Sequence, residues 1–141
     1  MPRPGAWCEA HLRARPAADA PRWYEVVDAD GQRTGAVFVR KAAGLWGTIE
    51  AAVGMDAALA RFTGLAVIDQ NETPGLGARI VEPWFWGQFK GKGAGLSLVP
   101  EGTKSPDADK MDAITGATIT TKAICDMLNT LAVEAKGLVE G

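Results

Sequence analysis

The sequence holds 141 residues, a length that suits one domain with a single hydrophobic core. Its composition, 47% hydrophobic and 23% charged, is that of a globular protein and excludes a wholly disordered chain. The formal net charge of −2 gives no electrostatic support for binding nucleic acid, and no run of lysine and arginine marks a membrane surface.

The first segment, residues 1–22, is rich in proline, alanine and arginine. It has no apolar core of a signal peptide and no run near the ~20 apolar residues of a membrane span. We expect it to be an irregular lead-in to a domain formed by residues 23–141. Cys8 and Cys125, which could be bridged or free, have no metal-ligand spacing, and His11 is the only histidine. The sequence therefore offers no metal site and no catalytic acid-base group.

The first half of the domain shows the pattern of antiparallel strands. Four segments carry it: 23–27, 35–39, 45–54 and 62–69. Asp28-Ala29-Asp30-Gly31 lies between the first two, and its Asp-Gly pair is a hairpin signal. The connection 55–61 could be a helical turn, because of its alanines, or a loop. We favour the loop, because short connections are the commoner choice between adjacent strands.

The second half predicts helices. Pro83 suits the first position of a short helix, and its aromatic residues are expected to form a second cluster of the core: Trp84, Phe85, Trp86 and Phe89. Residues 96–99 predict one more short strand. A long amphipathic helix follows, with an apolar stripe of Ile124, Met127, Leu128, Leu131, Ala135 and Leu138. Lys136-Gly137 predicts its end. The fold class is α+β, a twisted antiparallel sheet with packed helices, without a P-loop or Rossmann turn.

One motif, Asp112-Ala113-Ile114-Thr115-Gly116-Ala117-Thr118-Ile119-Thr120-Thr121, joins a polar loop to that helix. Its last threonines lie where the helix begins, and the free N–H groups and dipole there favour an anion. A threonine hydroxyl at this point can cap the helix or carry a phosphate. The small Gly116 and Ala117 suit either role, because they let the loop turn tightly.

Two further segments contain turn residues. Glu72-Thr73-Pro74-Gly75-Leu76-Gly77 is either a tight surface turn or a loop that lies against a planar ring, with backbone N–H groups left uncovered by its glycines. Gly44-Leu45-Trp46-Gly47 lies in a predicted strand. Trp46 is accordingly either a core aromatic residue or one wall of a ligand site.

In their order along the chain (44–47, 72–77 and 112–121), the three motifs resemble those of the FMN-binding domain family. The resemblance is to the G subunit of the Rnf electron-transport complex and the C subunit of the sodium-translocating NADH:quinone reductase, and it covers roughly residues 35–136. It implies FMN attached through a phosphoester to Thr118, with Thr73 and Leu76 as ring contacts. A separate flavin transferase that uses FAD and a divalent metal would make the bond, and Asp112 is an acid that this enzyme could engage. The candidate cofactor-binding residues are Thr115, Gly116, Ala117, Thr118, Ile119, Thr120, Thr121, Glu72, Thr73, Pro74, Gly75, Leu76, Gly77, Trp46 and Asp112.

The resemblance further implies an electron carrier rather than a complete enzyme. The flavin would relay electrons among other subunits of a membrane ion-translocating complex, on the outer face of the cytoplasmic membrane. Family members usually carry an N-terminal transmembrane helix, which residues 1–22 do not provide, so either the anchor is missing from this sequence or this member is soluble. Two alternatives stay open: a domain that binds FMN without a covalent bond, as a sensor or store, and a non-redox interaction module.

Overall fold

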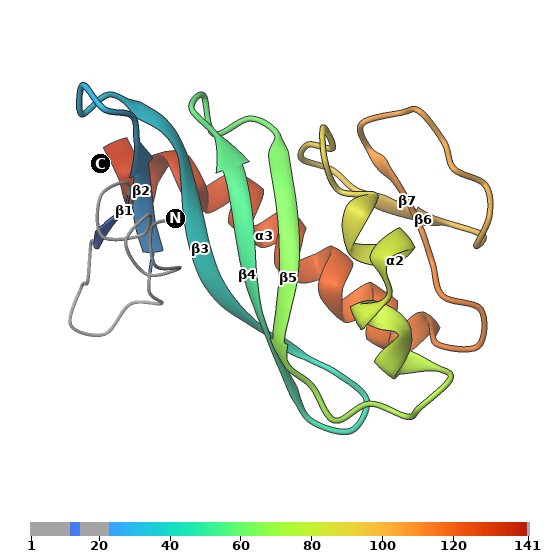
Figure 1. The fold of residues 1–141 in the computed structure, drawn as a ribbon. Helices are drawn as coiled ribbons and strands as arrows, with labels where there is room; N and C mark the ends of the chain where they lie inside the picture. The colour runs from blue at the N-terminus through green and yellow to red at the C-terminus, as the bar shows by residue number, and fades with distance from the viewer. Residues whose placement is uncertain (1–11, 15–22, 141) are drawn as a thin grey trace, which may run out of the picture.

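The structure is a computed structural model that describes residues 12–14 and 23–140. Its main layer is an antiparallel sheet in which every strand pairs with its neighbours in the chain (Figure 1). The five strands are β1 (Leu12–Ala14), β2 (Trp23–Val27), β3 (Arg33–Ala43), β4 (Thr48–Asp56) and β5 (Phe62–Asp69). The expected α+β class and antiparallel sheet are confirmed, and the connection after Asp56 is a turn, as predicted.

One face of the sheet forms the core. On β3 and β4 the alternating pattern places Phe38 opposite Val53 and Ala42 opposite Ile49, and all four side chains are buried. The long helix α3 (Thr118–Glu140) runs behind the sheet in Figure 1. The predicted stripe is buried on it, apart from the partly buried Leu138. Each such aliphatic side chain contributes roughly 1.5–3 kcal/mol through burial, so the packing of α3 on the sheet fixes where its first residue lies.

Beyond β5 lies a second group of short elements: η1 (Gly77–Val81), α2 (Pro83–Gly87), β6 (Ser97–Val99) and β7 (Lys110–Asp112). The strands β6 and β7 form a parallel pair, which the sequence pattern did not indicate. Pro83 lies in the first turn of α2, as predicted. The expected aromatic cluster is confirmed for Phe85 and Phe89, which are buried with ring centroids 5.4 Å apart, whereas Trp86 is 40% exposed.

Several boundaries differ from those expected. The strand expected over 35–39 is longer and runs over Arg33–Ala43, and the strand expected over 96–99 is Ser97–Val99. Leu12–Ala14 of the segment expected to be irregular forms β1, because its extended backbone pairs antiparallel with β2. The strand expected over 45–54 runs over Thr48–Asp56, since residues 45–47 are needed to turn the chain from β3 into β4. The helix α3 continues through Gly137 to Glu140, where the carboxylate Oε1 lies 3.0 Å from Arg33 Nη2. That contact and the packing of Leu138 act against the ~1 kcal/mol helix penalty of a glycine.

The sequence also led to expectations about the domain boundary, the cysteines, membrane segments and metal sites. The domain boundary at residue 23 stays a prediction, and Cys8 and His11 lie outside the described residues. Cys125 is a free, buried thiol on α3. Within the described residues, no helix combines the length and the hydropathy that crossing a membrane requires. The same residues contain no cluster of histidine, cysteine or carboxylate side chains suited to a metal ion.

Candidate functional site

The motif of residues 112–121 contains a turn, called the Thr118 turn below, that leads into α3. Ala117 N–H donates to the Ile114 carbonyl at 3.0 Å, and Gly116 has a φ of +79°, a conformation that L residues rarely adopt. A Cβ at Gly116 would also lie 3.1 Å from Leu76 Cδ2, so the turn approaches the glycine-rich loop closely. The positive φ favours glycine here, and the absence of a side chain lets the two predicted motifs lie in close contact.

The threonines at the start of α3 differ sharply in their surroundings. Thr120 is 3% exposed and its hydroxyl donates to Glu72 Oε1 at 2.7 Å. Thr121 is fully buried, and its hydroxyl donates to the Ala117 carbonyl at 2.8 Å and accepts from Ile114 N–H at 3.2 Å. Thr118 is exposed, and its hydroxyl has no partner among the residues that the structure describes. Of the three hydroxyls, only that of Thr118 is therefore available to an incoming group.

The first turn of α3 also presents free backbone donors. Thr121 N–H is bonded to the Ala117 carbonyl at 3.0 Å. The N–H groups of Thr118, Ile119 and Thr120 find no acceptor within residues 12–14 and 23–140. Three donors at the positive end of a 23-residue helix favour a phosphate beside Thr118.

Glu72 joins three segments of the chain at the site through hydrogen bonds. Its side chain is 5% exposed, and its carboxylate accepts the N–H of Leu45 at 2.7 Å, the N–H of Trp46 at 2.9 Å and the Thr120 hydroxyl at 2.7 Å. Burial alone would raise the pKa of Glu72, but the bonds from Thr120, Trp46 and Leu45 outweigh it and lower that pKa below its ordinary value. A charged Glu72 thus joins the β3–β4 turn and the loop after β5 to the start of α3.

Trp46 is neither in a strand nor in the core. It lies in the β3–β4 turn with 68% of its surface exposed, and its indole Nε1 donates to Thr73 Oγ1 at 2.9 Å. The alternative of a core aromatic residue is therefore wrong. An indole held by one hydrogen bond and otherwise open to solvent is free to pack on a planar ligand.

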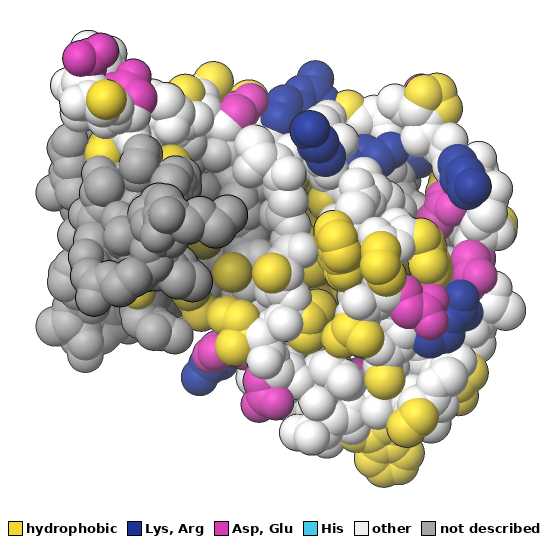
Figure 2. All heavy atoms as spheres, in the orientation of Figure 1, with side chains coloured by type: hydrophobic (Ala, Val, Ile, Leu, Met, Phe, Trp, Pro, Cys, Tyr) yellow, Lys and Arg dark blue, Asp and Glu magenta, His cyan; other side chains and the backbone are white. Residues whose placement is uncertain are grey.

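These segments enclose a cavity of about 310 Å³ next to Thr118. Its lining residues are Leu45, Trp46, Thr73, Leu76, Gly77, Gly116, Ala117, Thr118, Ile119 and Thr120. Four of them are large apolar side chains that remain more than 40% exposed: Leu45, Trp46, Leu76 and Ile119. Figure 2 shows hydrophobic side chains on the surface at the lower end of the molecule, where Figure 1 places the β3–β4 turn. Exposed apolar side chains around a hollow indicate a site for an apolar or aromatic ligand.

Several predicted site residues lie outside this cavity. Glu72, Pro74, Gly75 and Thr121 are not among its lining residues, and Gly75 has a φ of +77°. Thr115 is exposed and contributes its N–H to Glu101. The sequence did not single out Leu45 as a site residue, although it stands beside Trp46 in the same motif.

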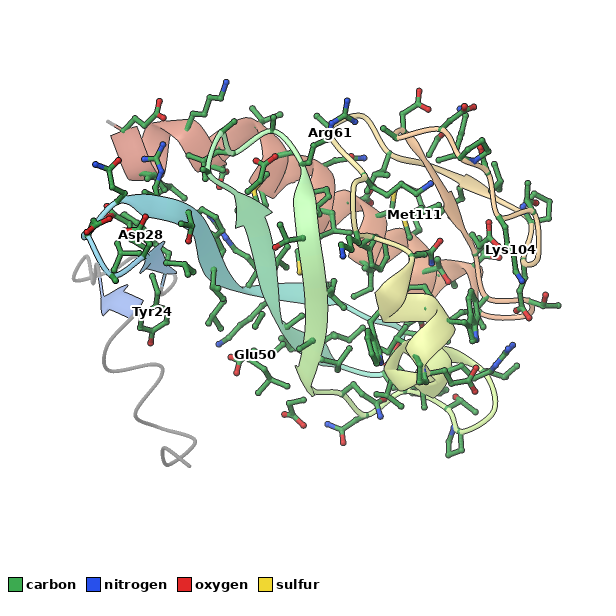
Figure 3. The ribbon with its side chains drawn as sticks, turned by 45° about the horizontal axis from the view of Figure 1, so that its top comes forward. Tyr24, Asp28, Glu50, Arg61, Lys104 and Met111 are labelled. Carbon is green, nitrogen blue, oxygen red and sulfur yellow. The ribbon has the colours of Figure 1, made fainter. Side chains whose placement is uncertain are left out.

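Asp112 does not reach the Thr118 cavity. It ends β7, is 5% exposed, and lines a larger cavity of about 800 Å³ together with Arg79, Trp84, Glu101 and Lys104. Figure 3 shows Lys104 on the loop between β6 and β7, and Met111 on β7 beside Asp112 in the chain. The sequence-based hypothesis was that a partner enzyme engages Asp112. Because Asp112 is buried, little of its carboxylate is accessible to such an enzyme.

The comparisons with known proteins agree with the geometry. The family described as the FMN-binding domain matches residues 44–133. The chain is 36% identical over 120 residues to the G subunit of the ion-translocating oxidoreductase complex of Methanosarcina acetivorans, covering 84% of this chain and 60% of the relative. It is 31% identical over 122 residues to the C subunit of the Na(+)-translocating NADH-quinone reductase of Haemophilus ducreyi, covering 82% of this chain and 47% of the relative. The crystal structure of the same reductase component from Parabacteroides distasonis has a TM-score of 0.69 and 32% identity, over 84% of this chain and 63% of that one. The chain thus spans less than two thirds of the length of these relatives.

Proposed function

The chain belongs to the FMN-binding domain family, and from this premise we propose that it carries FMN in a phosphoester to Thr118 and relays electrons between redox centres of a membrane complex. The observation that carries the proposal is the state of the Thr118 hydroxyl. It is exposed and free of partners among the described residues, while the hydroxyls of Thr120 and Thr121 are buried and bonded.

The residues around Thr118 fit FMN chemically. The N–H groups of Thr118, Ile119 and Thr120 would bind the phosphate oxygens at the helix N-terminus. Trp46 and Leu76 would cover the flat, apolar ring, and Thr73, whose hydroxyl already accepts from the Trp46 indole, would orient that wall. When bound, the flavin supplies one- and two-electron transfer, which none of the side chains of this cavity can perform.

Attachment needs a donor of FMN and a leaving group. With FAD as the donor, the Thr118 Oγ–P bond forms, the pyrophosphate bond of FAD breaks, AMP leaves, and the hydroxyl proton is lost to base. The free α3 donors would hold the phosphate during this step, but Thr118 has no histidine or carboxylate among its described hydrogen-bond partners to take the proton. We therefore assign proton transfer and metal binding to a separate flavin transferase.

The relatives point to the setting of the electron relay. One is named as a subunit of an ion-translocating oxidoreductase complex, and the other as a subunit of a Na(+)-translocating NADH-quinone reductase. We propose that this chain likewise works beside other subunits of a membrane complex, on the outer face of the cytoplasmic membrane. The exposed apolar wall suits such a carrier, because electron exchange requires a neighbouring cofactor to come close to the ring.

The test is flavin attachment by a flavin transferase supplied with FAD. The wild-type chain should gain the mass of one FMN less one water, on a peptide containing Thr118, and the flavin should survive denaturation. Thr118→Val should abolish the adduct. Thr130→Val is the matched control, since Thr130 is exposed on α3 and does not line the Thr118 cavity, and it should be labelled normally. An adduct that persists in Thr118→Val would refute the assignment.

The same experiment separates the alternatives. Yellow protein that loses all of its flavin on denaturation would support a sensor or store with non-covalent FMN. Colourless protein after treatment with the transferase would support a non-redox interaction module.

A further inference from the structure

The carboxylate of Asp112 accepts hydrogen bonds from two backbone N–H groups of the loop after β6. It accepts the N–H of Gly102 at 2.9 Å and the N–H of Lys104 at 3.1 and 3.2 Å. The backbone of Asp112 is held as well: its N–H donates to Gln88 Oε1 at 2.7 Å, and its carbonyl accepts from Gln88 Nε2 at 3.2 Å. With 5% of its surface exposed, Asp112 organises the loop after β6 and leaves almost nothing for another protein to contact.

That loop contains Glu101, whose side chain connects the loop to the Thr118 turn. One carboxylate oxygen of Glu101 accepts Thr115 N–H at 2.9 Å, and the two oxygens accept Nη1 and Nη2 of Arg79 at 3.0 and 3.1 Å. Thr115 lies three residues before Thr118, and Arg79 lies in η1, two residues after Gly77 of the cavity wall. A bidentate ion pair of this kind fixes orientation as well as distance.

We infer that Asp112 and Glu101 are positioning residues that hold the Thr118 turn in place through the loop between β6 and β7. The order of contacts is Asp112 to Gly102 and Lys104, then Glu101 to Thr115 and Arg79, and from there to both sides of the cavity. The backbone of Lys104 has a φ of +49°, so the loop adopts an uncommon conformation that the Asp112 carboxylate stabilises. This inference rests on the proposed function in one respect, the use of Thr118 as the acceptor.

Two substitutions test the relay with little change in shape. In Asp112→Asn, the amide nitrogen would face a backbone N–H in place of a carboxylate oxygen. In Glu101→Gln, the charged pair with Arg79 is lost: one oxygen can still accept from Thr115 N–H and Arg79 Nη1, but an NH₂ group would face Arg79 Nη2, so the turn is held less firmly. We expect either change to raise the hydrogen-exchange rate of the Thr115 amide at least tenfold. Either change should also lower the transferase's kcat for FMN attachment at Thr118 at least tenfold, with little change in the transferase's KM for this domain. Asp126→Asn is the matched control, because among the described residues Asp126 forms its ion pair with Lys122 on the exposed side of α3.

A double-mutant cycle distinguishes positioning from direct recognition by the transferase. If both residues act through one relay, the double variant should lose no more activity than the more impaired single variant. If Asp112 acts on the transferase itself, its effect should appear in KM, add to that of Glu101→Gln, and leave Thr115 exchange unchanged. That outcome would overturn the inference.

Two further outcomes are also informative. If Asp112→Asn fails to fold, Glu101→Gln carries the test alone, and unchanged Thr115 exchange and unchanged attachment in it would refute the relay. If the wild-type chain takes no FMN at Thr118, the proposed function fails, while Thr115 exchange still decides whether the relay holds the turn.

Discussion

Glu72 gives the sharpest test of how the site is built. In Glu72→Gln one oxygen remains, and it can still accept from Leu45 N–H and the Thr120 hydroxyl, which both bond Oε1. The Trp46 N–H, bonded to Oε2, would instead face an NH₂ donor. An unsatisfied donor costs roughly 1–3 kcal/mol, and two charge-assisted bonds that become neutral lose a few tenths to 1 kcal/mol each. Because Trp46 is close to solvent, we expect a loss of about 2–3 kcal/mol in the free energy of unfolding.

Urea unfolding followed by circular dichroism measures this loss. A domain of this size has roughly 5–15 kcal/mol of stability, so the variant should remain folded in water. Thr120→Val is the matched comparison, since it removes only one of the three bonds and should cost about 1 kcal/mol. A Glu72→Gln protein within about 0.5 kcal/mol of the wild type would show that the three bonds to this carboxylate do not join the segments as argued.

Two other predictions follow from the same geometry. Gly77→Ala should cost roughly 1–3 kcal/mol in urea unfolding, because its Cβ would meet Thr120 Oγ1 at 2.5 Å and Glu72 Cβ at 2.8 Å, whereas Gly87→Ala, with nothing within 4 Å, should cost far less. Hydrogen bonds from Arg79 and Thr115 lower the pKa of Glu101 from 4.5 to about 2. Its stabilising effect is therefore present above pH 4.5 and is lost as the pH falls towards about 2. Exchange of the Thr115 amide, corrected for its intrinsic pH dependence, should rise over that interval, and a profile identical to that of Glu101→Gln would contradict this account.

Local periodicity was enough to predict most of the fold. The strands β2 and β5 and the start of α3 lie where apolar alternation and the stripe through Ile124 and Leu131 put them. Periodicity fails where a turn contains apolar residues. Leu45 and Trp46 look like strand residues, but their side chains line a surface cavity and do not pack in the core.

The candidate site was predictable as a set of motifs but not as an arrangement. The bonds that assemble it join residues far apart in the chain: Glu72 to Thr120 spans 48 positions, and Arg79 to Glu101 spans 22. Neither Arg79 nor Glu101 belongs to a recognisable motif, and only the fold brings them to the Thr118 turn. Asp112 stands out in the sequence through its motif, yet its contacts with Gly102 and Lys104 depend on the loop conformation and have no signal in composition or spacing.

The arrangement divides the site into a fixed base and an open upper side, and this division suits a tethered carrier. Below, the buried groups of Glu72, Thr120 and Thr121 are bonded to one another or to backbone, so the start of α3 is held firmly. Above, Thr118 and Trp46 are exposed. A transferase must reach the hydroxyl once, and a redox partner must approach the ring repeatedly, so both steps require exposure at the same place. A buried flavin would satisfy neither requirement, and a loosely held threonine would let the ring drift from its partner. The combination of an exposed hydroxyl and a rigid base is therefore what the proposed function demands of this chain.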